Sequence, residues 1–167
     1  AKPMKCIKKL VALTLAAVLA LAMLTACGGT SETPIVETSK ETKMKVLSGL
    51  NKTRAELEKP DLEENDQLDL LAARHMAALK KCNANWNDAT LKTTKQKLFD
   101  EAYTLEINGA KVTRCQVRTL YIKENNHPIT TGKAFELDKL DADYVGIAVD
   151  NIGDNCYTIV WFVKTAD

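Results

Sequence analysis

Two segments near the C-terminus are dense in β-branched and aromatic residues, which favour extended strands. They are residues 144–149 (YVGIAV) and 157–163 (YTIVWFV). The residues between them include DNIGDN, which is rich in the Asp, Asn and Gly that form turns. This order predicts an antiparallel β-hairpin, so the fold must contain a sheet close to the C-terminus.

Three segments before the hairpin show the spacing of three and four residues between apolar positions that is typical of amphipathic helices. They cover residues 44–57, 68–79 and 88–102, and Asn65 or Asp66 can cap the second helix. Helices first and a hairpin last indicate an α+β fold in which helices are layered on a sheet.

The middle of the chain is less regular. Residues 103–108 (YTLEIN) alternate in polarity and predict a short strand before a turn at Asn108-Gly109. Residues 110–124 are predicted to form a fourth helix, because their apolar positions fit a helical face. Residues 125–142 are predicted to form a loop.

The N-terminal residues have the composition of an export signal. Four lysines precede an apolar run from Leu10 to Leu24, and residues 1–26 contain no acidic residue. The run is shorter than the roughly 20 residues that span a bilayer. No later segment is apolar for long enough to be a second span.

The end of this signal, LTAC at residues 24–27, resembles the bacterial lipobox. The resemblance implies that the signal peptide (1–26) is removed and that Cys27 carries the lipid. The protein would then be anchored at the extracytoplasmic face of a bacterial cell membrane, where several acyl chains on one residue hold stably. Residues 27–43 are predicted to be a flexible tether, and residues 44–167 a single domain.

Charge and cysteine content restrict the partners and the cofactors. Without the four signal lysines, the 23 basic residues fall to 19 against 22 acidic ones, a net charge of about −3. This balance argues against a nucleic-acid partner. Cys82, Cys115 and Cys156 are odd in number and allow at most one disulfide, whose pairing stays open. With only His75 and His127 available, a four-ligand zinc site is poorly supplied.

Two blocks resemble the CAP superfamily of SCP-like extracellular domains. The first is residues 50–79, which match the opening of these domains at Asn51, Arg54, Pro60, Leu62, Asn65, Leu68, Ala72 and His75. The second is residues 144–162, which resemble the closing hairpin. The blocks occur in the order of the family and cover about 50 residues. The resemblance implies an α-β-α sandwich with a central antiparallel sheet and a C-terminal β-hairpin.

The same resemblance implies a cleft around His75. Glu106 is the nearest match to the acid that the family places there, and Lys133 takes the place of the second histidine. An ammonium group removes a ligand and repels a cation, so a divalent metal is disfavoured and we expect no cofactor. His75 could instead be an ordinary histidine at the edge of a packed face, and Glu106 a solvated residue.

Two tryptophans differ in their surroundings. Trp161, in the last predicted strand, is expected in the core. Trp86 lies in the polar segment NANWNDAT and could be an exposed contact residue or a loop anchor that packs back onto the domain.

Three functions remain open at this point. The first is a membrane-anchored, non-catalytic binding module for an extracellular protein, a peptide or an envelope ligand. The second is an envelope-associated hydrolase that uses a cleft of His75 and a carboxylate. It would need a nucleophile or a metal that the sequence does not indicate. The third is a small substrate-binding lipoprotein, for which the 141 residues from Cys27 onward are few.

Overall fold

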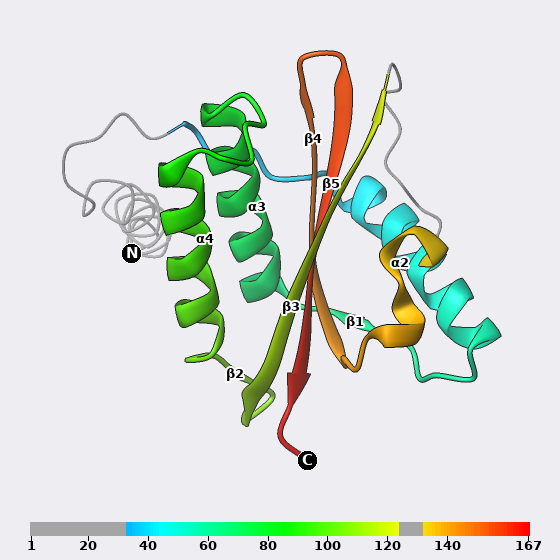
Figure 1. Ribbon diagram of the computed structural model, residues 1–167. Coiled ribbons are helices and arrows are strands. Elements are labelled where there is room, and N and C mark those ends of the chain that lie inside the picture. The colour runs from blue at the N-terminus through cyan, green and yellow to red at the C-terminus, as the bar shows by residue number, and fades with distance from the viewer. Residues whose placement is uncertain (1–32, 124–131) are drawn as a thin grey trace, which may run out of the picture. The chain divides into compact units, whose positions relative to one another are not determined.

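The computed structural model describes residues 33–123 and 132–167 (Figure 1). Its elements are, in chain order, the helix α2 (Lys40–Glu56), the strand β1 (Glu63–Glu64), the helices α3 (Asp66–Lys81) and α4 (Ala89–Ala102), the strands β2 (Glu106–Ile107) and β3 (Ala110–Lys123), the 3-10 helices η1 (Gly132–Phe135) and η2 (Leu137–Lys139), and the strands β4 (Tyr144–Ile152) and β5 (Asn155–Thr165).

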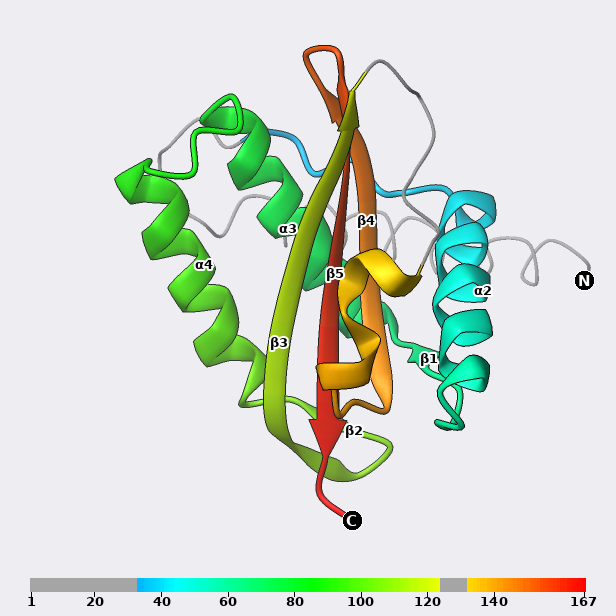
Figure 2. The ribbon, with the colours of Figure 1, turned by 45° about the vertical axis from the view of Figure 1, so that its right-hand side comes forward.

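The strands form one mixed sheet in the order β1-β4-β5-β3-β2. The three long strands β4, β5 and β3 are antiparallel, and β1 adds a short parallel pair at Glu63 and Glu64. Helices α3 and α4 cover one face, while α2 and the 3-10 helices cover the other (Figures 1 and 2). The α+β class, the three layers and the terminal hairpin are as predicted.

Both tight turns of the sheet are set by their sequence. Asn108 and Gly109 have φ of 53° and 82°, so they form the two-residue turn that joins β2 to β3. The β4–β5 turn is shorter than DNIGDN suggested, because Ile152 pairs with Asn155. Only Gly153 and Asp154 are left to turn, and Gly153 takes the positive φ.

The predicted helix over residues 110–124 is wrong. Residues Ala110–Lys123 form β3, which pairs with β5 along almost its whole length. The Asn-Gly turn feeds the chain directly into an antiparallel return, and β5 is buried almost throughout and needs a partner on each edge. This tertiary requirement overrides an apolar spacing that also fitted a helix.

The helices begin close to the predicted positions, with one exception. Asn65 caps α3, since its side chain accepts hydrogen bonds from the amides of Gln67 and Leu68. Helix α2 begins at Lys40, four residues before the predicted start, behind Ser39 as its cap. Thr38 also bonds to β4, as its hydroxyl accepts from the amide of Val149 at 2.8 Å. The last residues of the predicted tether therefore belong to the fold.

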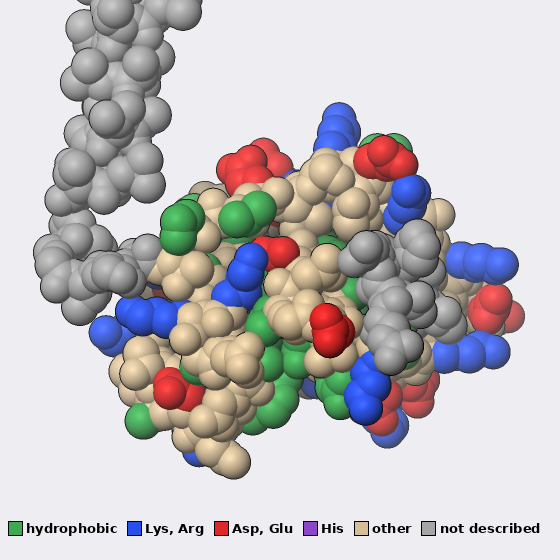
Figure 3. Space-filling model, turned by 90° about the horizontal axis from the view of Figure 1, so that it is seen from above, with side chains coloured by type: hydrophobic (Ala, Val, Ile, Leu, Met, Phe, Trp, Pro, Cys, Tyr) green, Lys and Arg blue, Asp and Glu red, His purple; other side chains and the backbone are tan. Residues whose placement is uncertain are grey.

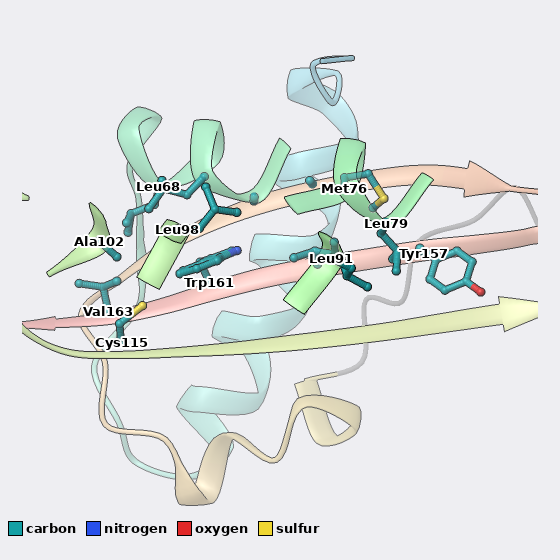
Figure 4. Close-up of a cluster of buried hydrophobic side chains, with 14 of the residues drawn as sticks. Leu68, Met76, Leu79, Leu91, Leu98, Ala102, Cys115, Tyr157, Trp161 and Val163 are labelled. Carbon is teal, nitrogen blue, oxygen red and sulfur yellow. The ribbon is translucent and has the colours of Figure 1, made fainter. Parts of the chain in front are cut away.

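Each face of the sheet has its own apolar core. The larger one lies under α3 and α4 and surrounds Trp161, which is fully buried (Figure 4). The smaller one lies under α2 and the 3-10 helices, around Phe135 and Phe162. Gly146 allows α3 to approach β4 closely, because a Cβ there would lie 2.0 Å from the carbonyl carbon of Leu68.

Candidate functional site

His75 lies inside the larger core. Its side chain projects from α3, is 1% exposed, and meets the ring of Trp161 edge-on at 6.0 Å between centroids. Its Nδ1 has no hydrogen-bonding partner among the described residues. Burial, and to a smaller extent Lys95, lowers the pKa of His75 to about 4, so the ring is neutral at pH 7.

The predicted cleft of His75, Glu106 and Lys133 does not form. Glu106 is exposed on the short strand β2, and Lys133 is exposed on η1, which contacts α2. Helices α2 and α3 lie on opposite faces of the sheet (Figure 2). The sheet therefore separates Lys133 from His75, and no described acid hydrogen-bonds to the buried imidazole. Sequence reasoning placed these residues by their order in the family and could not see the sheet between them.

The other CAP-like positions build the connection from α2 to α3. The side-chain amide of Asn51 makes two hydrogen bonds with the backbone of Leu62. Its oxygen accepts from the N–H at 2.8 Å, and its NH₂ group donates to the carbonyl at 3.0 Å. Buried Arg54 donates from Nε to the carbonyl of Pro60 at 2.5 Å and from Nη2 to that of Ala142 at 3.1 Å. These polar groups are satisfied within the fold.

A charged cluster that the sequence did not indicate joins α2 to α3. Lys43, placed in the predicted tether, donates to Glu64 at 2.8 Å and to Asp69. Asp69 also accepts from the amide of Ile147 on β4 at 2.7 Å. Burial raises the pKa of Asp69 to about 6, with Glu64 acting in the same direction and Lys43 and Ile147 opposing it.

Within the described residues, this cluster also contains three acidic side chains that lie close enough together to hold a metal ion. Ligand atoms of Glu64, Asp66 and Asp69 lie within 4.8 Å of one another. The ammonium group of Lys43 already binds the carboxylates of Glu64 and Asp69. This positive side chain therefore occupies the position that a metal ion would need. The geometry of the cluster is that of a structural tie between α2, α3 and the edge of β4.

A hollow of about 370 Å³ lies at the turn between β4 and β5. We call it the hairpin-end hollow. Its walls come from three parts of the chain: the turn after α3, the end of β3, and the hairpin itself. The lining residues are Asn83, Ala84, Lys123, Ile152, Gly153, Asp154, Asn155 and Tyr157.

Aromatic rings stand beside this hollow. Tyr157 is stacked on Tyr121 with 5.2 Å between centroids and 27° between planes, and Trp86 lies 6.4 Å from Tyr157 on a tilted plane. Trp86 and Tyr121 are 46% and 49% exposed. The hydroxyl of Tyr157 points away from the core cluster (Figure 4). Trp86 thus packs back onto the domain as a loop anchor and is half exposed, and its role as a contact residue stays a prediction.

Polar side chains of the hollow keep free hydrogen-bonding capacity. Within the described residues, those of Asn83, Asp154 and Asn155 have no hydrogen-bonding partner, and Lys123 has no ion pair. Figure 3 looks down on this end and shows apolar side chains at the surface among scattered acidic and basic ones. Of these residues, sequence reasoning singled out Trp86 alone; the rest converge only through the fold.

The three cysteines of the domain do not pair with one another, and two of them are buried. Cys82, Cys115 and Cys156 are free thiols, and burial raises the pKa of Cys115 to about 12. Within residues 33–123 and 132–167, no helix is long and apolar enough to cross a membrane. Cys27 and His127 lie outside the described residues.

No known family pattern and no curated protein matches the chain. Among solved structures, the fold is similar to that of an outer surface protein from Borrelia burgdorferi, with a TM-score of 0.51 and 16% sequence identity. The match covers 77% of this chain and 96% of that protein. At this identity the likeness concerns the fold alone, because sites are grafted onto folds and do not follow from them.

Proposed function

We propose that this chain is an extracytoplasmic binding module, held on the bacterial membrane by a lipid on Cys27, and that its ligand binds at the hairpin-end hollow. The module is non-catalytic, and it is a divergent member of the CAP superfamily. The observation that carries the proposal is the hollow itself. Polar side chains without a partner among the described residues line it together with Tyr157, and the half-exposed rings of Trp86 and Tyr121 pack on Tyr157 beside it. Aromatic and polar groups in one place are the usual make-up of a recognition surface.

Several features support the location and the family. The lysine-rich start, the apolar run and LTAC at residues 24–27 have the order of a lipoprotein signal. The similar solved structure is named as an outer surface protein, which fits a surface location. The CAP assignment is supported by the α-β-α layers and by the two sequence blocks, which occupy the α2–α3 connection and the final hairpin.

The hydrolase alternative is weakened by the position of His75. A general base must reach the proton that it abstracts, and this imidazole is buried against Trp161 with an unpartnered Nδ1. Among the described residues, no nucleophile hydrogen-bonds to this Nδ1. The substrate-binding alternative gains no specific support, because the hollow lies at one end of a single domain.

The anchoring can be tested by metabolic labelling with a radioactive fatty acid. We expect label on the wild-type protein and none on Cys27→Ser. Label that persists in Cys27→Ser would contradict the anchor.

The binding site can be tested with the exported, unlipidated Cys27→Ser protein and isolated bacterial envelopes in a sedimentation assay. Trp86→Ala and Tyr121→Ala should each weaken binding at least about tenfold, since exposed aromatic residues carry much of the binding free energy. Tyr103→Ala is the matched control, because Tyr103 is 50% exposed and lies at the other end of α4. Equal binding by all three variants would exclude the hairpin end as the site.

A further inference from the structure

We infer that the hairpin-end hollow binds a neutral carbohydrate, a glycan of the cell envelope. This inference rests on the proposed function, because it names the ligand class for the same site. Three observations carry it: the aromatic rings that stand beside the hollow, the kind of hydrogen-bonding groups that line it, and the charge of its lining.

The aromatic rings offer flat faces to a ligand. Tyr121 is directly opposite Tyr157 in the β3–β5 pairing, and Trp86 approaches Tyr157 from the turn after α3. The face of an aromatic ring is electronegative, while the C–H groups on one side of a sugar ring are weakly positive. A sugar bound in the hollow can therefore extend onto the half-exposed rings of Trp86 and Tyr121, which adjoin it through Tyr157, while its edges stay polar.

The polar groups match the edges of a sugar. A hydroxyl group both donates and accepts hydrogen bonds, and a carboxamide does the same with its NH₂ and its oxygen. Asn83 and Asn155 bring two carboxamides to the hollow, and Asp154 adds an acceptor. These side chains have no partner among the described residues, so they can bond to a ligand without breaking a bond to that part of the chain.

The charge of the lining favours a neutral ligand. One basic residue, Lys123, and one acidic residue, Asp154, cancel formally. A nucleic acid or another polyanion would require several basic groups on one face. The volume of about 370 Å³ is near the lower end of small-molecule sites, which suits a short stretch of a glycan.

A polypeptide ligand is less well served by this surface. Peptides commonly extend a sheet at an open strand edge. The edge of β4 is occupied, since the amides of Ile147 and Val149 donate to Asp69 and Thr38. On the outer edge of β3, the amides of Val112 and Cys115 donate to the carbonyl of Leu105 and the hydroxyl of Tyr103. Beyond Cys115 this edge has no strand partner within the described residues, but a strand added there would not need Asn83 or Trp86.

The test uses the same envelopes in three preparations and the unlipidated Cys27→Ser protein. One preparation is digested exhaustively with protease, one is extracted with organic solvent to remove lipid, and one receives both treatments and keeps only the glycan. We expect binding to all three within about twofold. Asn83→Ala and Asn155→Ala should each weaken binding to the glycan about tenfold, and Tyr103→Ala should not change it.

A second readout follows the ligand directly. The chain has two tryptophans, of which Trp86 is half exposed and Trp161 is fully buried. Iodide should therefore quench Trp86 alone, and solubilised glycan should protect it in a saturable way. Trp86→Phe supplies the control without the quenchable signal.

The outcomes separate the two proposals. Loss of binding after protease alone would show a polypeptide ligand, and loss after solvent extraction would show a lipid. Either result overturns the glycan inference while the binding module stands, provided that Trp86→Ala still weakens binding to untreated envelopes. Binding that no hairpin-end variant weakens would overturn the proposed function itself.

Discussion

The two ends of the sheet use their polar residues in opposite ways. At the end where β1 joins β4, the side chains of Asn51, Arg54 and Asp69 form hydrogen bonds with the backbone of the domain. At the hairpin end, the side chains of Asn83 and Asn155 form no hydrogen bond within the described residues. Buried polar groups must be satisfied for the fold to be stable, whereas exposed ones are free to meet a ligand. The CAP-like motif therefore reports on the scaffold, and the candidate site lies where no motif pointed.

The largest expected effect comes from the close approach at the β1 end. Gly146→Ala would place a Cβ 2.0 Å from the backbone of Leu68, and neither α3 nor β4 can move without disturbing the larger core. We expect a loss of about 3 kcal/mol or more in the free energy of unfolding, measured by urea denaturation. Gly153→Ala is the comparison at the hairpin end. Nothing lies within 4 Å of its Cβ, so only the positive φ costs free energy, about 1 kcal/mol. Equal losses would contradict the difference between the ends.

Arg54 should give the next largest effect. Arg54→Met keeps most of the side-chain volume but leaves the carbonyls of Pro60 and Ala142 without their charged donor. We expect a loss of about 2–3 kcal/mol, because hydrogen bonds to charged groups are worth more than neutral ones. Arg118→Met, in a half-buried arginine on β3, should cost less than about 1 kcal/mol, since its ion pair with Glu136 is long at 4.0 Å.

His75 tests the core between the two ends. Its pKa is about 4 in the fold and about 6.5 in the unfolded chain, so the unfolded state binds the proton first as the pH falls. Stability that is present above pH 6.5 is therefore lost towards pH 4, by about 3 kcal/mol. His75→Phe should remove this part of the pH dependence. Unfolding curves of both proteins from pH 7 to pH 4 give the difference, and parallel profiles would contradict a buried neutral imidazole.

Asp69 changes the stability with pH in the opposite direction to His75, over an overlapping pH range. Its pKa is raised to about 6 from an unfolded value near 3.8, so here the folded state binds the proton first. This group lowers stability above pH 6, and the penalty is relieved as the pH falls towards 3.8. The dependence of wild-type stability on pH is consequently flatter than His75 alone would make it. The effect of His75 must therefore be measured as the difference between the wild type and His75→Phe.

Much of the fold could be predicted from local signals. The α+β class, helices α3 and α4 and the cap at Asn65 follow from spacing and capping residues, and the Asn108-Gly109 turn follows from its φ requirements. Strand β3 could not be distinguished from a helix, because its apolar positions fit both periods and the decision lies with its partner β5. Lys43 was assigned to the tether from the composition of that segment, and its carboxylate partners on β1 and α3, far along the chain, could not be foreseen.

The candidate site was less predictable than the fold for a related reason. His75, Glu106 and Lys133 were grouped by family order, and the sheet places His75 and Lys133 on opposite faces. The hairpin-end residues are ordinary turn and strand residues when taken one by one. A turn after α3, the end of β3 and a hairpin are brought together only by the pairing of β3 with β5. No local pattern encodes that convergence.

The smallest expected effect on stability belongs to the hairpin end, and it is the one that separates the two ends most clearly. Asp154→Ala and Asn155→Ala remove side chains that bond to nothing among the described residues. The free energy of unfolding should change by less than about 0.5 kcal/mol in each case, measured by urea denaturation. A loss above about 1 kcal/mol would mean that these groups belong to the scaffold like Asn51. Near-neutral stability together with a large loss of binding in Asn155→Ala is the combination that a binding surface requires, because the amide then serves the ligand and not the fold.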